Sequence, residues 1–150
     1  MRDSGVFVTC CRDAEDTNIV KCALDHASVG LVDTRAEDTG ILVLSMHHYD
    51  KQNHHSMILT TSKGSYGIGE IIDPLTERER RNLLLCHSFT GNDTVSPIFG
   101  FSKEKLFEKI CRTDPIEKQV AAFYDSYASK NEVVKAGANF FHFIYNRNET

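Results

Sequence analysis

One sequence feature constrains the fold of this chain most: an amphipathic segment at residues 13–28 lies between two short runs of β-branched residues. Residues 6–10, after Gly5, are rich in β-branched side chains, which predicts a short strand. Residues 13–28 place apolar side chains three and four positions apart, which predicts a helix, and Gly30 ends it before a strand at residues 31–34. Strand, helix and strand form a βαβ pattern. We therefore expect an α/β fold with a mainly parallel sheet and with ligands at the carboxyl ends of its strands.

The middle of the chain predicts one more helix and a β-hairpin. The apolar run at residues 41–48 fits a strand or a helix, and we interpret it as a helix because Asp38-Thr39 offers an N-cap. Residues 56–61 predict a strand. A turn at residues 63–67 then leads to a second apolar run at 68–72, which predicts the other strand of the hairpin.

The segment before and after residue 90 predicts two helices joined by a loop. Thr76 precedes a charged stretch that becomes apolar at residues 83–86, which predicts a helix. Ser102 occupies an N-cap position before an amphipathic segment at residues 103–112, which predicts a second helix.

The C-terminal segment is helical by pattern. Pro115 suits a helix start, a break is expected near residues 129–131, and a further helix is predicted at 133–145. The aromatic residues of that last helix favour core packing or a partner surface over the stacking of bases. We therefore expect a core domain at residues 1–112 and a C-terminal helical extension at 113–150.

The composition of the chain is that of a folded globular domain. Of 150 residues, 41% are hydrophobic and 25% are charged, which excludes a disordered chain. The formal net charge of −4 argues against strong, sequence-independent binding of nucleic acid through a basic surface. It does not exclude a metal-dependent nuclease, because such an enzyme needs an acidic pocket and the bound cations reverse its sign.

Cysteine and histidine usage argues against the common disulfide and zinc frameworks. The five cysteines are odd in number and show no Cys-x-x-Cys spacing, and the chain starts with a polar segment. We therefore expect reduced thiols in an intracellular protein, nuclear or cytoplasmic, and no membrane partner. Two pairs of adjacent histidines lack zinc-site spacing, which favours a solvated loop. They are His47, His48, His54 and His55.

Four aspartates occupy positions where a helix or a strand is predicted to begin or end. Asp13 and Asp16 fall in the first turn of the helix at 13–28, and Asp38 lies just beyond the strand at 31–34. Asp93 lies in the turn Gly91-Asn92-Asp93-Thr94. Each position also has a purely structural interpretation, as a helix cap or as a turn residue.

The sequence His-Ser-Phe-Thr-Gly-Asn-Asp-Thr-Val-Ser-Pro-Ile-Phe-Gly at residues 87–100 resembles a family signature. It is similar to His-x-x-Thr-Gly-Cys-Asp-Thr-x-Ser-x-x-Phe-Gly of the PIN-like, flap-endonuclease-like nucleases, many of them eukaryotic and transposon-associated. Residues 13–17 and 33–39 match further segments of the family in the same order, so the resemblance spans roughly residues 5–112.

The resemblance implies a PIN-like three-layer fold with a central sheet, incomplete at its amino terminus, that hydrolyses phosphodiester bonds of nucleic acid. By this resemblance Asp16, Asp38 and Asp93 are catalytic. The acids implied to hold Mg²⁺ or Mn²⁺ are Asp13, Asp16, Asp38 and Asp93. Lys103 and Lys105 are expected to contact nucleic acid, with DNA favoured over RNA.

Three departures from the family pattern lead to a second hypothesis. Gly40 stands where the family has a second acid, and the only acid near the predicted strand at 6–10 is Asp3, on its wrong side. A Gly-x-Gly-Lys segment of the family reads Gly-Phe-Ser-Lys at residues 100–103. The chain is therefore either a degenerate nuclease domain that still binds a cation, or a catalytically inactive adaptor. Such an adaptor would bind nucleic acid, a protein partner or a second copy through an exposed sheet edge or the C-terminal helices.

Overall fold

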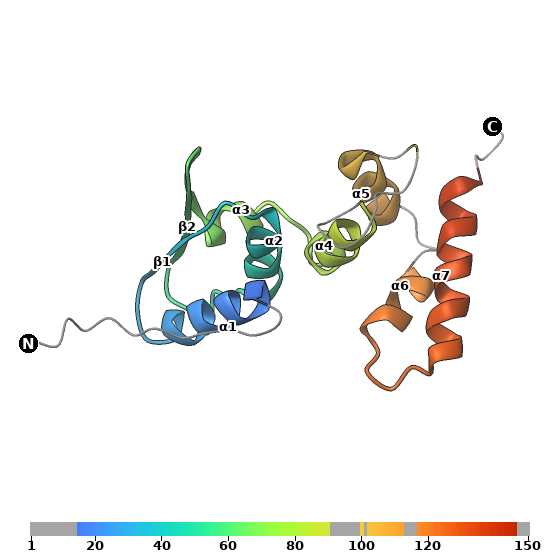
Figure 1. Ribbon diagram of the computed structural model, residues 1–150, viewed down its shortest axis with the longest axis horizontal. Helices are drawn as coiled ribbons and strands as arrows, with labels where there is room; N and C mark the ends of the chain where they lie inside the picture. Colours follow the sequence, from blue (N-terminus) through green and yellow to red (C-terminus); the bar gives the residue numbers. More distant parts are fainter. Residues whose placement is uncertain (1–14, 91–99, 101, 113–116, 147–150) are drawn as a thin grey trace, which may run out of the picture. The chain divides into compact units, whose positions relative to one another are not determined.

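The computed structural model describes residues 15–90, 100, 102–112 and 117–146 (Figure 1). The chain divides into two compact units, residues 1–73 and residues 74–150. Within the described residues there are seven helices and one small three-stranded sheet, which confirms the expected α/β class. The predicted strand at residues 6–10 lies outside the described residues.

The first unit contains the sheet and three helices. In chain order these elements are α1 (Glu15–Ala27), β1 (Val32–Arg35), α2 (Thr39–His48), β2 (Met57–Thr61), β3 (Gly64–Gly67) and α3 (Ile68–Ile72). The strand order is β1-β2-β3, with β1 parallel to β2 and β2 antiparallel to β3. The sheet is therefore mixed, and α2 forms the crossover between the two parallel strands.

The hairpin confirms one sequence prediction and corrects another. A hairpin follows the strand near residues 56–61 as predicted, but its second strand is β3, at the position where we expected the turn. The hairpin closes early because Thr61 pairs with Gly64, whose φ of 146° favours glycine. The apolar run at 68–72 is the helix α3. Its residues Ile68 and Ile72, four positions apart, share one helix face and are both buried.

The sheet of the first unit has a covered face and a polar face. Met57 and Leu59 of β2 are each 1% exposed and face the core, whereas Asp33 and Arg35 of β1 are exposed and form an ion pair at 3.7 Å. Helix α1 packs against both α2 and β1. Among the described residues no second layer of helices covers Asp33 and Arg35, so this part of the fold has two layers.

The described part of the second unit contains four helices. They are α4 (Glu77–Phe89), α5 (Lys103–Arg112), α6 (Glu117–Tyr124) and α7 (Lys130–Tyr145). Local signals set three of their starts: Thr76 and Ser129 form capping boxes, and the Ser102 hydroxyl accepts a hydrogen bond from the Lys105 amide at 3.3 Å. The predicted helices are thus confirmed here, although α7 begins three residues earlier than expected.

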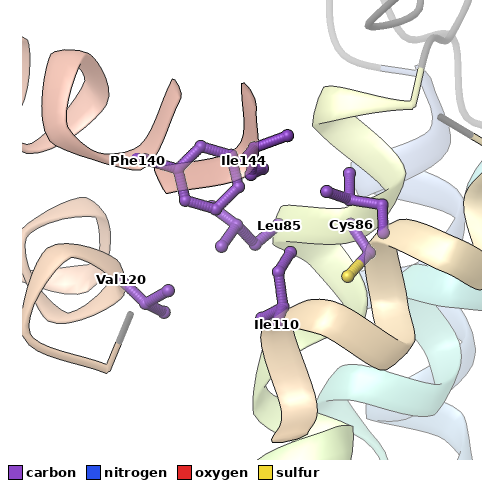
Figure 2. Packing of buried hydrophobic residues seen from close by; sticks show 7 residues of the cluster. Leu85, Cys86, Ile110, Val120, Phe140 and Ile144 are labelled. Carbon is purple, nitrogen blue, oxygen red and sulfur yellow. The ribbon is translucent and has the colours of Figure 1, made fainter. Parts of the chain in front are cut away.

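The core of the second unit joins all four helices (Figure 2). Its buried members are Leu85, Cys86, Leu106, Ile110, Val120, Phe140 and Ile144. The expected division at residues 112 and 113 therefore differs from the division into compact units, because α4 and α5 share their core with α6 and α7. Burial, together with a smaller contribution from the nearby Cys111, raises the pKa of the Cys86 thiol to about 12.

The aromatic residues of α7 serve both the core and the surface. Phe140 is fully buried, and its ring centroid lies 4.6 Å from that of Phe89 in α4. Phe141 and Tyr145 are 38% and 51% exposed. The helix therefore contributes to the core, as the pattern favoured, and it also leaves an apolar stripe on its outer side.

Candidate functional site

A pocket lies where the two parallel strands of the first unit end. β1 leads through residues 36–38 into α2, and β2 ends at Thr61, so the carboxyl ends of both strands meet the start of α2. The pocket measures about 160 Å³ and is lined by Glu37, Asp38, Thr39, Leu42, Leu59, Thr61, Lys63 and Tyr66. This is the edge at which open α/β sheets bind their ligands.

Asp38 has two roles at this edge. Its backbone is extended, and its Oδ1 accepts a hydrogen bond from the Gly40 amide at 2.6 Å, which makes it the N-cap of α2. The capping interpretation is therefore confirmed. Because the cap uses one oxygen, Oδ2 is left without a hydrogen-bond partner within the described part of the chain.

Glu37 links the start of α2 to the hairpin. Its Oε1 accepts a hydrogen bond from the Ser62 amide at 2.6 Å, and its Oε2 accepts one from the Ser62 hydroxyl at 2.8 Å. Both oxygens are thus used in holding the hairpin loop next to Asp38. Our sequence analysis did not single out Glu37, although it lies beside Asp38 in the 33–39 segment.

The hairpin contributes hydrogen-bond donors to the opposite side of the pocket. Tyr66 of β3 lies directly across the ladder from Leu59, so its side chain is on the same face of the sheet as that buried residue. Lys63 lies in the two-residue loop between the strands and is exposed. Neither the Lys63 ammonium nor the Tyr66 hydroxyl has a polar partner among the residues that the structure describes.

Two of the four predicted metal-binding acids, Asp16 and Asp38, lie within the described residues. Asp38 lines the pocket, and Asp16 is half-buried in the first turn of α1, the helix that packs against α2. Asp13 and Asp93 lie outside the described residues. Within the described ranges, no three His, Cys, Asp or Glu side chains come together as a metal site. The four-acid cluster therefore stays a prediction.

The predicted nucleic-acid contacts lie in the second unit. Lys103 and Lys105 are exposed in the first turn of α5, near the capping residue Ser102. Nothing in their local geometry distinguishes them from other solvent-exposed lysines, so their role as nucleic-acid contacts stays a prediction.

Hydrogen bonds order the histidine-rich segment. His54 Nδ1 accepts a hydrogen bond from the Asp50 amide at 2.9 Å, and its ring stacks on Tyr49 with the ring centroids 5.7 Å apart. Asp50 Oδ1 in turn accepts a hydrogen bond from the Gln52 amide at 2.9 Å. The segment is thus a tight loop at the end of α2.

Comparisons with known proteins identify no relative: no protein family, curated protein or solved structure matches the chain. Among the described helices, none has both the length and the hydropathy needed to cross a membrane.

Proposed function

We propose that this chain is a degenerate PIN-like, flap-endonuclease-like nuclease domain that binds Mg²⁺ or Mn²⁺ at Asp38 and hydrolyses phosphodiester bonds. One observation supports this proposal most. Asp38, an acid of the family-like segments, lies at the carboxyl ends of two parallel strands with a carboxylate oxygen open to a pocket. The full PIN-like three-layer fold is part of the same proposal.

The donor set of the pocket fits a hard cation. Asp38 offers a carboxylate oxygen and Thr39 offers a hydroxyl group, and Mg²⁺ and Mn²⁺ prefer oxygen ligands of this kind. Mg²⁺ commonly uses one or two protein carboxylates and keeps several waters, so one open carboxylate at a partly solvated edge is a sufficient anchor. Asp16 and Asp93 are the proposed additional ligands, by the family resemblance.

Each protein group has a defined task in the proposed reaction. The cation, when bound, lowers the pKa of a coordinated water and stabilises the negative charge that develops on the phosphate. Asp38 would hold the cation with Oδ2, and its Oδ1 accepts the capping hydrogen bond from the Gly40 amide, so the ligand is positioned by the helix that it caps. Gly40 has no side chain and cannot supply the second acid of the family pattern, which predicts weak activity.

The test compares thermal unfolding in Mn²⁺ between the wild type, Asp38→Asn and a control, Asp25→Asn. Asparagine is as good an N-cap as aspartate, so Asp38→Asn removes the charge but keeps the helix start. Asp25 is exposed on α1 and does not line the pocket. At a Mn²⁺ concentration tenfold above Kd, linkage stabilises the wild type by about 1.4 kcal/mol. For a unit of this size that raises Tm by roughly 6–11 °C.

The expected result is a Tm increase in the wild type and in Asp25→Asn that is absent in Asp38→Asn. Mn²⁺-dependent cleavage of branched and single-stranded DNA, lost in Asp93→Ala, supports the catalytic part of the proposal. Equal Mn²⁺ responses in the wild type and Asp38→Asn would contradict the metal site.

A stripe of apolar side chains on α7 favours a second candidate function, that of a catalytically inactive adaptor for a protein partner. Val134, Phe141 and Tyr145 are 62%, 38% and 51% exposed, and their spacing of seven and four positions places them on one helix face. The adaptor hypothesis predicts concentration-dependent self-association or partner binding that Val134→Lys abolishes. Sedimentation velocity of both proteins, with Lys135→Glu as a control for a charge change on the same helix, measures the self-association.

A further inference from the structure

On the hairpin side of the pocket, two hydrogen-bond donors have no partner among the described residues, whereas most acceptors on the α2 side are already used. Both oxygens of Glu37 bind Ser62, and one oxygen of Asp38 binds the Gly40 amide. The Lys63 ammonium and the Tyr66 hydroxyl, by contrast, find no acceptor in the described part of the chain. A ligand that binds the Lys63 ammonium and the Tyr66 hydroxyl must therefore carry hydrogen-bond acceptors. Because the ammonium is positively charged, an anionic acceptor is favoured.

Unlike the other lysines and arginines of residues 15–73, Lys63 both lines the pocket and lacks an acidic partner among the described residues. The lysines and arginines among residues 15–73 are Lys21, Arg35, Lys51 and Lys63. Arg35 pairs with Asp33 and Lys51 pairs with Asp73. Lys21 is exposed on α1 and does not line the pocket, so among the described residues Lys63 is the only lysine or arginine that lines it.

The loop that carries Lys63 is held in place by its neighbours. The Lys63 amide donates to the Thr61 hydroxyl at 3.1 Å, and Ser62 is bound by both oxygens of Glu37. Gly64, with its φ of 146°, follows directly. The backbone of Lys63 is thus fixed beside Asp38, and only its flexible side chain must order when a ligand binds.

We propose that Lys63 and Tyr66 bind the phosphate group of a single-stranded nucleic acid, with the neighbouring base stacked on the Tyr66 ring. The inference rests on the proposed function, because it supplies the substrate contact for the pocket of Asp38. A cation held by Asp38 would complement a phosphate bound at Lys63, because both positive charges would offset the negative charge of the phosphate.

The size of the pocket and the exposure of Tyr66 define how a strand fits. A cavity of about 150 Å³ holds one benzene molecule. The 160 Å³ of this pocket therefore holds one group of about that size and not a whole nucleotide, so a phosphate bound in it leaves no room for the attached base. Tyr66, at 38% exposure, offers its ring at the rim, where a base stacks without regard to its sequence.

The experiment measures fluorescence anisotropy of a labelled oligothymidine strand in Ca²⁺, over a series of salt concentrations. Lys63→Gln is expected to weaken binding about tenfold and to reduce the slope of log K against log salt by about 0.7, the value for one phosphate contact on a single strand. Tyr66→Ala is expected to weaken binding about tenfold with an unchanged slope, because stacking releases no counterions. Lys21→Gln is the matched control and keeps the wild-type affinity and slope.

Conservative variants separate binding from folding. Lys63→Arg restores the charge and is expected to restore the salt slope, and Tyr66→Phe keeps the ring and is expected to bind more tightly than Tyr66→Ala. A Lys63→Gln variant that matches Lys21→Gln in affinity and slope overturns the proposal. So does a wild type that does not bind the strand at about 50 mM salt, where phosphate contacts are strongest. Displacement of the strand by thymidine monophosphate at an equal concentration also overturns it, in favour of a free nucleotide.

The Mn²⁺ response of Lys63→Gln separates this inference from the proposed function. A retained Tm increase in Lys63→Gln, together with lost strand binding, supports both. A Mn²⁺ response in the wild type with strand binding independent of Lys63 refutes only the phosphate contact. Strand binding that depends on Lys63, without any Mn²⁺ response, refutes only the metal site.

Discussion

Truncation of Phe140 tests whether the two compact units unfold separately. Phe140 is fully buried, and its ring centroid lies 4.6 Å from that of Phe89 and 6.4 Å from that of Phe123. Phe140→Ala removes these contacts and leaves a cavity, which costs about 3–5 kcal/mol. A single core of the size found in residues 74–150 rarely supplies more than about 3–5 kcal/mol in total. We therefore expect the second unit to be largely unfolded in this variant at 25 °C.

Hydrogen exchange followed by mass spectrometry is the appropriate assay, because it reports each element separately. In Phe140→Ala, the amides of α4, α5 and α7 should lose protection while those of α1, α2 and β2 keep it. Met57→Ala, at a position 1% exposed in the first unit, should give the reverse pattern. Ile144→Val removes one buried methyl group and should lower the protection of the second unit by only about 0.5–1.5 kcal/mol.

Equal loss of protection in both units of Phe140→Ala would refute the reasoning. It would show that the chain unfolds as one cooperative domain, in which the two cores depend on each other.

Three further predictions concern polar groups whose surroundings the structure defines. The Ser45 hydroxyl is fully buried without a hydrogen-bond partner among the described residues, so Ser45→Ala should stabilise the first unit by about 1 kcal/mol in urea unfolding. Thr76→Ala and Ser129→Ala each remove a capping box and should destabilise the second unit by about 1 kcal/mol, whereas the matched change Thr76→Ser should cost much less. The third prediction is a pH dependence. The folded state keeps the Cys86 thiol protonated up to about pH 12, whereas the unfolded thiol ionises near pH 9. The second unit should therefore lose up to about 1.4 kcal/mol of stability per pH unit above pH 9, and Cys86→Ala should reduce this slope.

Each of these three predictions has a contradicting outcome. An unchanged or lowered urea midpoint in Ser45→Ala would show that the hydroxyl has a partner in the folded chain. Full stability of both cap variants would show that the helix starts are set by packing. A pH slope that is the same in Cys86→Ala and the wild type would assign the alkaline loss to other groups, such as Cys111 and Tyr124, whose pKa values burial also raises.

The sequence predicted most helices because their signals are local. The spacing of apolar residues and the caps Thr76, Ser102 and Asp38 lie within a few positions of the helices that they start. The hairpin was placed correctly but its second strand was not. The apolar residues at 68–72 fit both the two-residue period of a strand and the 3.6-residue period of a helix. Because Thr61 pairs with Gly64, the second strand ends before residue 68, and residues 68–72 form a helix.

The pocket could be predicted only in part. The position of Asp38 just after a predicted strand placed it near the carboxyl edge of the sheet, where the pocket lies, and ligand binding there stays a prediction. No sequence pattern singled out Glu37, Lys63 or Tyr66, because their roles depend on contacts between segments far apart in the chain. Glu37 and Ser62, for example, are 25 positions apart and meet only when β1 and β2 pair.

The sequence by itself determined most of the helices and the first strand of the hairpin, because backbone propensity, caps and apolar spacing act over a few residues. Only the tertiary structure decided which polar groups can still form a hydrogen bond or an ion pair with a ligand. Asp38 keeps one oxygen after capping α2, Glu37 keeps none, and the ammonium of Lys63 is without a partner among the described residues. A hydrogen bond needs its two groups within about 3 Å, and for distant segments that distance is set by packing.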